Sequence, residues 1–353
     1  MKKGKPLKPM LQKINEDSKR HKDYIVNLKD LQMFSAKLGK QIFPRLKVNE
    51  QCSGTLNDHA LGKLCRKLQI PANYIRLCLP WGNVVVDNLN HWIDVTKDRK
   101  LMIRVRENGS DTIGDNVIRA VLSDRYKRLD NDLVANKTLD KLMDMKAEIK
   151  YASYNGDQLN LTAVTPELSG EVKVGDTVQG GITITNCEVG TQSLLIQPFI
   201  YRLVCSNGMV APRYLNRFYA KHVGKVLIDL DKDDQAIKII HKMQKQLELV
   251  SNPELFQENL QKLKDATNVT THSTKVVQLF KHHSLSDWER KEVFQRLDNH
   301  IVGDSFTTDN YTLSNAITNV ANHEEVSEDR ARFLQELGGL IIFAHNPNAI
   351  KLR

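Results

Sequence analysis

Apolar residues recur at every second position in the middle of the chain and at helical spacing toward its C-terminus. Alternation with a period of two predicts strands, and four segments have it: residues 101–106, 117–122, 147–154 and 158–164. Asn155-Gly156 joins the last two segments and is the strongest hairpin signal in the sequence. Residues 181–185 and 194–205 predict a further pair of strands around Gly190. The middle of the chain is therefore predicted to be antiparallel β-structure.

Helical patterns lie on both sides of this region. Residues 57–79 predict two helices separated by a break, with Asn57 or Asp58 as the N-cap and Pro71 opening the second helix. Helical spacing dominates after about residue 230. The helices predicted there are residues 236–250, residues 253–264, a helix reaching residue 297 behind the capping box Ser286-Asp-Trp-Glu289, and a last long helix from Ser327.

Strands that come first and helices that follow indicate an α+β fold rather than an alternating parallel-sheet fold. We expect an antiparallel β-sheet with hairpins in the middle of the chain, packed by helices, and a helical C-terminal third. The expected regions are a flexible basic arm at 1–22, an α+β domain at 23–230 with the central sheet, and a helical region at 231–353 packed on the same core. Within the α+β domain, residues 23–28 predict a short strand and residues 28–38 a helix.

Positive charge is concentrated near the N-terminus. The chain has a formal net charge of +9, and its first fifty residues hold eleven Lys and two Arg against five acidic residues, a net charge of +8. Such asymmetry is typical of an arm that meets a polyanion, for which nucleic acid is the usual candidate. It is equally typical of a solvated leader that keeps a protein soluble, so charge alone leaves both interpretations open.

Composition argues against membrane and disulfide chemistry. No segment approaches the roughly eighteen consecutive apolar residues of a membrane span, and no apolar stretch follows the basic N-terminus as a secretory signal requires. We therefore expect a cytoplasmic protein without membrane contact. The five cysteines are odd in number and none forms a Cys-x-x-Cys pair, so we expect reduced thiols and neither disulfides nor zinc.

Motifs for catalysis are weak. Gly180-Gly181 precedes a predicted strand and not a helix, so it does not fit a nucleotide-binding loop. One nuclease-like element is an alternative: Glu148-Ile-Lys150 on a predicted strand, with Asp130 upstream, could hold Mg²⁺ for phosphodiester cleavage. Alternating charge between neighbouring strands explains the same residues. We expect no catalytic set, no metal and no cofactor.

The densest functional signal is basic and aromatic. Residues 119–131 place four cations and a tyrosine at and beyond a strand, and residues 213–222 contain no acidic side chain. Cations neutralise phosphates, and tyrosines offer flat faces on which unpaired bases stack. Asp124, Asp130 and Asp132 could instead hold nearby arginines in internal ion pairs. The candidate nucleic-acid contacts are Arg104, Arg106, Arg119, Arg125, Tyr126, Lys127, Arg128, Arg202, Arg213, Tyr214, Arg217 and Lys221.

Three long motifs in these segments resemble the family named domain of unknown function 932, whose members are described as phage/plasmid-like proteins. The motifs are Leu122-Ser-Asp-Arg-Tyr-Lys-Arg-Leu-Asp-Asn131, Gly181-Ile-Thr-Ile-Thr-Asn-Cys-Glu-Val-Gly190 and Pro198-Phe-Ile-Tyr-Arg-Leu-Val-Cys-Ser-Asn-Gly-Met209. Looser matches around residues 64–77 and 315–323 extend the resemblance over about residues 57–340. The family usually has Ser where this chain has Cys187, which argues against an essential hydroxyl there.

This resemblance implies a mobile-element or viral protein in the cytoplasm of a host cell, but no settled activity. More distantly, a basic sheet with a hairpin and packed helices resembles the annealing proteins related to eukaryotic Rad-fifty-two, which bind single strands along an oligomeric ring without nucleotide hydrolysis. The expected function is therefore that of a homo-oligomer that binds single-stranded DNA, or RNA, and anneals DNA during phage or plasmid recombination. A metal-dependent nuclease and a protein-binding phage module, such as a host-defence antagonist or virion component, are the alternatives.

Overall fold

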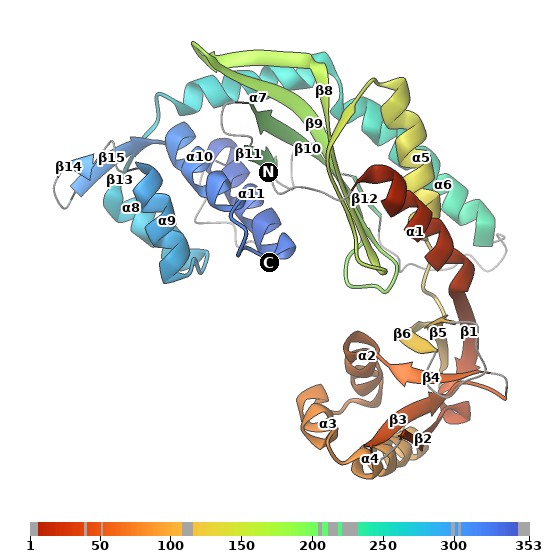
Figure 1. Cartoon of the computed structure of the whole chain (residues 1–353). Coiled ribbons are helices and arrows are strands. Elements are labelled where there is room, and N and C mark those ends of the chain that lie inside the picture. The colour runs from red at the N-terminus through yellow and green to blue at the C-terminus, as the bar shows by residue number, and fades with distance from the viewer. Residues whose placement is uncertain are drawn as a thin grey trace.

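The chain folds into an arch with a small lobe at one end, a second sheet in the middle and a helical region at the other end (Figure 1). The computed structural model describes residues 6–38, 41–50, 52–107, 116–203, 207–210, 218–220, 232–297, 301–302 and 305–344. Its strands lie mainly in the first two thirds of the chain and helices dominate the last third. The predicted α+β class, with an antiparallel sheet in the middle of the chain, is confirmed.

The small lobe contains a six-stranded sheet with the order β1-β5-β6-β4-β3-β2. All neighbours are antiparallel except β4 and β6, which are parallel. The strands are β1 (His21–Asn27), β2 (Gln32–Leu38), β3 (Gln41–Lys47), β4 (Ser53–Leu56), β5 (Lys100–Arg106) and β6 (Val117–Ser123). The helices α2 (Asp58–Leu68), α3 (Ala72–Cys78) and α4 (Gly82–Val95) complete the lobe and share its hydrophobic core.

The pair of helices predicted around Pro71 is confirmed as α2 and α3. Asn57 is the N-cap of α2, because its side chain accepts a hydrogen bond from the backbone N–H of Ala60 at 2.8 Å. The helix predicted over residues 28–38 is wrong. A short 3-10 turn, η1 (Leu28–Asp30), is followed there by strand β2, which pairs with β3 along its whole length. Pairing with β3 outweighs the local helical spacing of this segment.

The second sheet contains the central strands of the chain in the order β11-β10-β9-β8-β7, with β12 also paired to β10. Its strands are β7 (Glu148–Tyr154), β8 (Gln158–Lys173), β9 (Asp176–Cys187), β10 (Leu194–Arg202), β11 (Asn207–Val210) and β12 (Phe218–Ala220). The hairpin predicted at Asn155-Gly156 joins β7 to β8, with Gly156 at φ +101°, where glycine is favoured. The β9–β10 pair is also confirmed. Residues 23–230 therefore contain two sheets and not one.

Three helices from distant parts of the chain share the hydrophobic core of the second sheet: α1 (Leu7–Arg20), α5 (Asn131–Asp144) and α6 (Lys232–Val250). Met10 and Ile14 of α1 are almost completely buried in this core. The prediction of a flexible arm therefore does not hold for residues 7–20. Apolar residues at positions 7, 10, 11 and 14 form one side of a helix, and the lysines lie on its exposed side.

The C-terminal region consists of α7 (Pro253–Ala266), α8 (Ser273–His282), α9 (Asp287–Leu297), α10 (Asn310–Val320), α11 (Glu328–Phe343) and the short strands β13 (Thr270–His272), β14 (Ile301–Val302) and β15 (Ser305–Asp309). Helix α7 packs Phe256 and Leu260 against the far part of β8, while α8 to α11 form a separate core. The capping box of α9 is confirmed, since Ser286 and Glu289 exchange side-chain to backbone hydrogen bonds. Across the described residues, no helix combines the length and apolar character needed to cross a bilayer.

Candidate nucleic-acid interface

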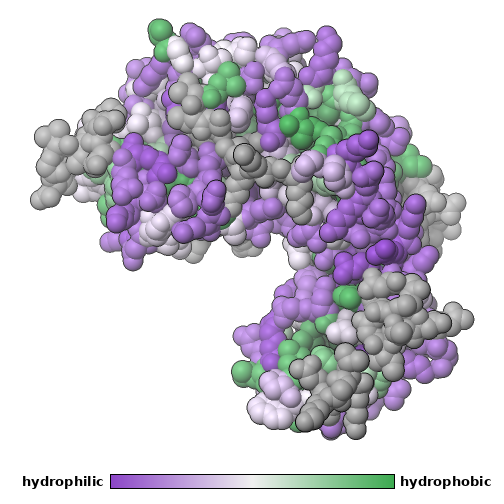
Figure 2. All heavy atoms as spheres, viewed as in Figure 1, coloured by the Kyte–Doolittle hydropathy of each residue, from purple (hydrophilic) through white to green (hydrophobic). Residues whose placement is uncertain are grey.

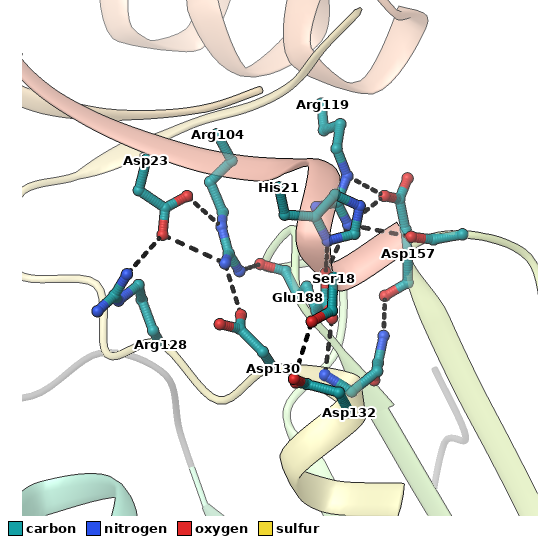
Figure 3. A network of polar contacts seen from close by, with 12 residues as sticks. Ser18, His21, Asp23, Arg104, Arg119, Arg128, Asp130, Asp132, Asp157 and Glu188 are labelled. Carbon is teal, nitrogen blue, oxygen red and sulfur yellow. Dashed lines mark hydrogen bonds and ion pairs between the residues drawn. The ribbon is translucent and has the colours of Figure 1, made fainter. Parts of the chain in front are cut away.

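A buried network of charged side chains joins the small lobe to the second sheet (Figure 3). Its central cations are Arg104 of β5 and Arg119 of β6, each only 1% exposed. Arg104 donates from Nε to Asp23 Oδ1 at 2.8 Å and from Nη2 to Asp130 Oδ1 at 2.5 Å. These acids come from β1 and from the residue before α5, so a single guanidinium connects three separate segments.

Glu188 is the central carboxylate of this junction. It follows β9 and is 1% exposed. Its Oε2 lies 2.6 Å from Nη2 of Arg119 and 3.3 Å from Nδ1 of His21. Its Oε1 accepts a hydrogen bond from the backbone N–H of Asn131, in the first turn of α5, at 2.7 Å. Asp157, in the β7–β8 turn, accepts from Nε of Arg119 at 2.8 Å. The end of β9 is thereby tied to β1, β6 and α5.

The network is electrostatically self-contained. Burial by itself would raise the pKa of Glu188, but the hydrogen bond with His21 and the charges of Arg119 and Arg104 outweigh burial and hold this pKa at about 2. Glu188 is therefore ionised at neutral pH. The guanidiniums of the network are those of Arg104, Arg119 and Arg128, and the carboxylates are those of Asp23, Asp130, Asp157 and Glu188. No surplus positive charge is left here for a phosphate.

Three of the predicted nucleic-acid contacts are buried in this junction. Residues 101–105 of β5 are buried on both faces, so Arg104 is not open to a ligand. Tyr126 is 6% exposed, its hydroxyl donates to the Glu188 carbonyl at 2.9 Å, and burial raises its pKa, so its ring has no face open to a base. Arg104, Arg119 and Tyr126 therefore hold the junction together. Internal ion pairs occupy the two arginines, and hydrogen bonds to backbone carbonyls hold Tyr126.

The other predicted contacts that the structure describes do not lie together. Arg106 is half-buried beside the β7–β8 turn. Arg125 is exposed, Lys127 is half-buried, and the exposed Arg128 makes a 3.3 Å ion pair with Asp23. These residues lie around the junction.

Arg202 lies at the opposite end of the second sheet. It makes two hydrogen bonds of 2.6 and 2.7 Å to Asp176, the first residue of β9, whereas Glu188 follows the last. The length of β9 separates the two sites by roughly 35 Å. The predicted contacts Arg213, Tyr214, Arg217 and Lys221 lie outside the described residues.

The nuclease residues are not brought together. Asp130 precedes the N-terminus of α5 and bonds to Arg104, while Glu148 follows the C-terminus of that helix. A helix of 14 residues spans about 20 Å. Lys150 bonds to Glu148 at 2.6 Å, so the two charges pair with each other within β7 and not between neighbouring strands. Nowhere in the described part of the chain do three His, Cys, Asp or Glu side chains form a group that could hold a metal ion.

A second group of cations has a different environment. Helix α2 lies on the side of the small lobe that faces the hollow of the arch (Figure 1). Lys63 of α2 donates to the carbonyl oxygen of Gly190 at 3.2 Å, and Gly190 packs against Tyr126. This contact places Lys63 beside the β6–α5 turn. We call Lys63, Arg66, Lys67, Arg99 and Arg125 the α2 cation cluster; within the described residues, none of the five makes a salt bridge.

The pKa values of the two lysines show the electrostatic environment of the cluster. Burial lowers the pKa of Lys63, and the charges of Arg66 and Lys67 lower it further. Burial likewise lowers the pKa of Lys67; Arg99 and Arg66 add to this effect and Asp124 opposes it. Both lysines are half-buried. Positive charge in the cluster is thus partly desolvated and crowded by other cations, and an approaching anion would relieve both penalties.

Sequence reasoning identified Arg125 but not the four other members of the cluster. Their signal was present in the sequence. Residues 59–75 contain no acidic residue, and Lys63, Arg66 and Lys67 have the spacing that places them on one helix surface. Arg99 precedes β5 and joins them only through the fold, because the start of β5 pairs with the end of β6.

Comparison with known proteins gives one match. The family model described as "Domain of unknown function (DUF932)" matches residues 119–336. No curated protein and no solved structure matches the chain. The matched segment begins inside β6, at Arg119 of the junction, and includes the second sheet and most of the helical region. Since it covers more than half of the sequence, the chain belongs to this family of unknown function.

Proposed function

We propose that this protein binds single-stranded nucleic acid and acts as an annealing protein in the recombination of a phage or plasmid, without nucleotide hydrolysis. The observation that carries the proposal is the α2 cation cluster. It combines five positive charges on one side of the small lobe; among the described residues none of the five makes a salt bridge, and Asp124 is the one acidic residue whose charge acts on Lys67. A phosphate backbone is a ligand that supplies negative charge repeatedly along such a surface.

The energetics of the two half-buried lysines support a phosphate ligand. Each is destabilised in its charged form by burial and by neighbouring cations. A bound phosphate would stabilise the charged form and raise the pKa of both ammonium groups. The resemblance to annealing proteins supplies the recombination setting and the expectation of a homo-oligomer in a host cytoplasm, and the absence of a nucleotide-binding loop from the sequence agrees with it.

The structure bears differently on the two alternative functions, the nuclease and the protein-binding module. Metal-dependent cleavage is not proposed, because Asp130 and Glu148 lie at opposite ends of α5. A protein-binding phage module is kept as an outcome of the test, since a cation cluster can also meet an acidic protein.

Salt dependence of binding tests the proposal. A labelled oligothymidylate is titrated with the full chain from 50 to 200 mM salt, with Mg²⁺ present and the oligonucleotide length checked afterwards. Six to ten phosphate contacts would reduce affinity by roughly three to five decades over this range on a duplex, and by somewhat less on a single strand. The length should not change. No binding even at 50 mM would overturn the proposal, and binding of an acidic protein instead would favour the phage module.

A charge-matched pair of variants identifies the surface. The double variant Lys63→Gln/Lys67→Gln should lower the slope of log affinity against log salt by about 1.4, since each contact to a single strand contributes about 0.7. The control is Lys242→Gln/Lys245→Gln on α6, where both lysines are exposed and the net charge changes equally. Equal losses in both variants would mean that overall charge, and not the α2 cation cluster, drives binding.

A further inference from the structure

The small lobe has an apolar groove that the charged sites do not use. The groove has a volume of about 750 Å³ and lies between the start of α4, strands β3 and β4, and the first turns of α2. Its walls include Phe43, Pro44, Leu56, Leu79, Trp81 and Val84. Among the described residues that line it, none is charged. Figure 2 shows hydrophobic atoms gathered on the face of the small lobe where Figure 1 places these elements.

Several of these side chains are unusually exposed for their type. Trp81 is 64% exposed, and Phe43, Leu79 and Val84 are each between 37% and 41% exposed. A cluster of large apolar side chains open to water costs free energy and usually marks a binding surface. The turn after α3 presents Trp81, because its backbone N–H bonds to Cys78 and its carbonyl accepts from the first turn of α4. The indole is therefore displayed by a hydrogen-bonded turn.

The charge around the groove distinguishes between possible occupants. One wall of the groove, Phe43 and Pro44, belongs to β3. Of the basic residues in this strand, Arg45 is buried and Lys47 pairs with Glu50, so the positive charge nearest to the groove has to come from elsewhere on the lobe. On the same lobe, α2 provides Leu61 to the groove and Lys63 and Lys67 to the α2 cation cluster. Exposed aromatic side chains on a lobe that also has a cationic surface are the arrangement that stacks unpaired bases while nearby cations hold the phosphates.

We propose that the groove is a stacking site for unpaired nucleobases, with Trp81 and Phe43 as the stacking residues. This inference rests on the proposed function and adds to it the part of the nucleic acid that is recognised. Duplex DNA keeps its bases stacked on one another, so this site would take single strands.

Abasic oligonucleotides separate this site from the phosphate-binding cluster. A 20-mer of thymidylate and an abasic 20-mer carry the same backbone charge, so their affinity ratio reports the bases. Trp81→Ala should reduce that ratio by about five- to a hundred-fold, the range expected for loss of one stacked base, and leave affinity for the abasic strand unchanged. Trp81→Phe should retain most of the ratio. Lys63→Gln/Lys67→Gln should weaken both strands alike.

Two control variants and a fluorescence measurement guard against misfolding. Leu77→Ala removes an apolar side chain that is 73% exposed on the same lobe but outside the groove, and Trp92→Ala removes an exposed tryptophan of α4 outside the groove. Neither should change the ratio. The chain has three tryptophans, so a Trp92→Phe/Trp288→Phe variant reports Trp81 alone. Thymidylate should quench its fluorescence, and the abasic strand should not.

The possible failures are distinguishable. If neither strand binds at low salt, the proposed function fails and the stacking site fails with it. If the abasic strand binds but Trp81→Ala leaves the affinity ratio unchanged, only the stacking site is overturned. If Trp81→Ala changes the oligomeric state in sedimentation and leaves the ratio intact, the groove is a contact between copies of the chain and the stacking site is again overturned.

Discussion

The junction and the α2 cation cluster use the same residue types for opposite purposes. Arg104 and Arg119 are 1% exposed and each pairs with two carboxylates. Lys63 and Lys67 are half-buried and have cations as neighbours. Both regions lie beside β6, and Gly190 and Tyr126 form part of the packing between them. The comparison teaches that balance by acids, and not the number of basic residues, decides whether positive charge serves the fold or a ligand.

The largest expected effect is on the junction side of this comparison. Glu188→Ala should lower the free energy of unfolding by about 3–5 kcal/mol, because it leaves a buried guanidinium without one of its carboxylates. Urea denaturation at neutral pH measures the change. Glu50→Ala is the control, since Glu50 makes an exposed ion pair with Lys47 whose loss should cost at most about 1 kcal/mol. Equal losses in the two variants would show that the junction pairs are no stronger than surface pairs.

Acid should weaken the junction in a defined pH range. The pKa of Glu188 is about 2 in the folded protein against an ordinary value of 4.5, so its ionised form stabilises the fold above pH 4.5. That stabilisation, roughly 3 kcal/mol, should disappear as the pH falls from 4.5 toward 2. Urea midpoints measured across this range should fall more steeply for the natural chain than for Glu188→Gln. Parallel curves would contradict the assignment.

The next expected effect is smaller and compares two arginines of the same loop. Arg125 belongs to the α2 cation cluster, whereas Arg128 pairs with Asp23 of the junction. Arg125→Gln should reduce oligothymidylate affinity by about tenfold at 50 mM salt, through the loss of one phosphate contact. Arg128→Gln, with the same change in charge, should leave affinity unchanged. Equal effects on affinity would remove the distinction between the two regions.

The smallest expected effect has the opposite sign. Lys63 and Lys67 are like charges four residues apart on α2, and such pairs destabilise a helix by roughly 0.2–0.5 kcal/mol. Lys63→Gln/Lys67→Gln should therefore stabilise the free protein by a few tenths of a kcal/mol in urea denaturation. A loss of stability would mean that these lysines contribute to the fold, as the junction arginines do.

Short sequence motifs correctly predicted the turns and helix starts that depend only on neighbouring residues. Asn155-Gly156 predicted the β7–β8 hairpin, Asn57 the start of α2, and Ser286 with Glu289 the start of α9, because each acts on backbone groups only a few residues away. Helix α5 was missed although Asp130 and Asp132 flank its first residue, and Val134 and Leu142 lie on its buried side. These are ordinary helix-start and amphipathic signals.

The candidate site was less predictable because it depends on what covers each strand. Alternation in β5 correctly indicated two faces, but nothing local to the strand shows that Asp130 and Glu188 would cover the face with Arg104. The α2 cation cluster combines residues of α2 with Arg99 and Arg125, which come close to each other because β5 pairs with β6. Exposure of Trp81 depends on the turn between α3 and α4, and the sequence pattern does not reveal which face of that turn stays open.

Helix α1 ends at Arg20 and β1 begins at His21, so the chain passes from one hydrophobic core to the other without a linker. We therefore expect that the segment that matches the family, residues 119–336, does not fold alone. A fragment excised at residue 119 would lack Met10 and Ile14 from the core beneath the second sheet, and would retain only residues 119–123 of β6 from the first sheet. Its bare faces would favour aggregation. Structural dissection of this protein must therefore begin near its N-terminus, because the two lobes form one inseparable unit.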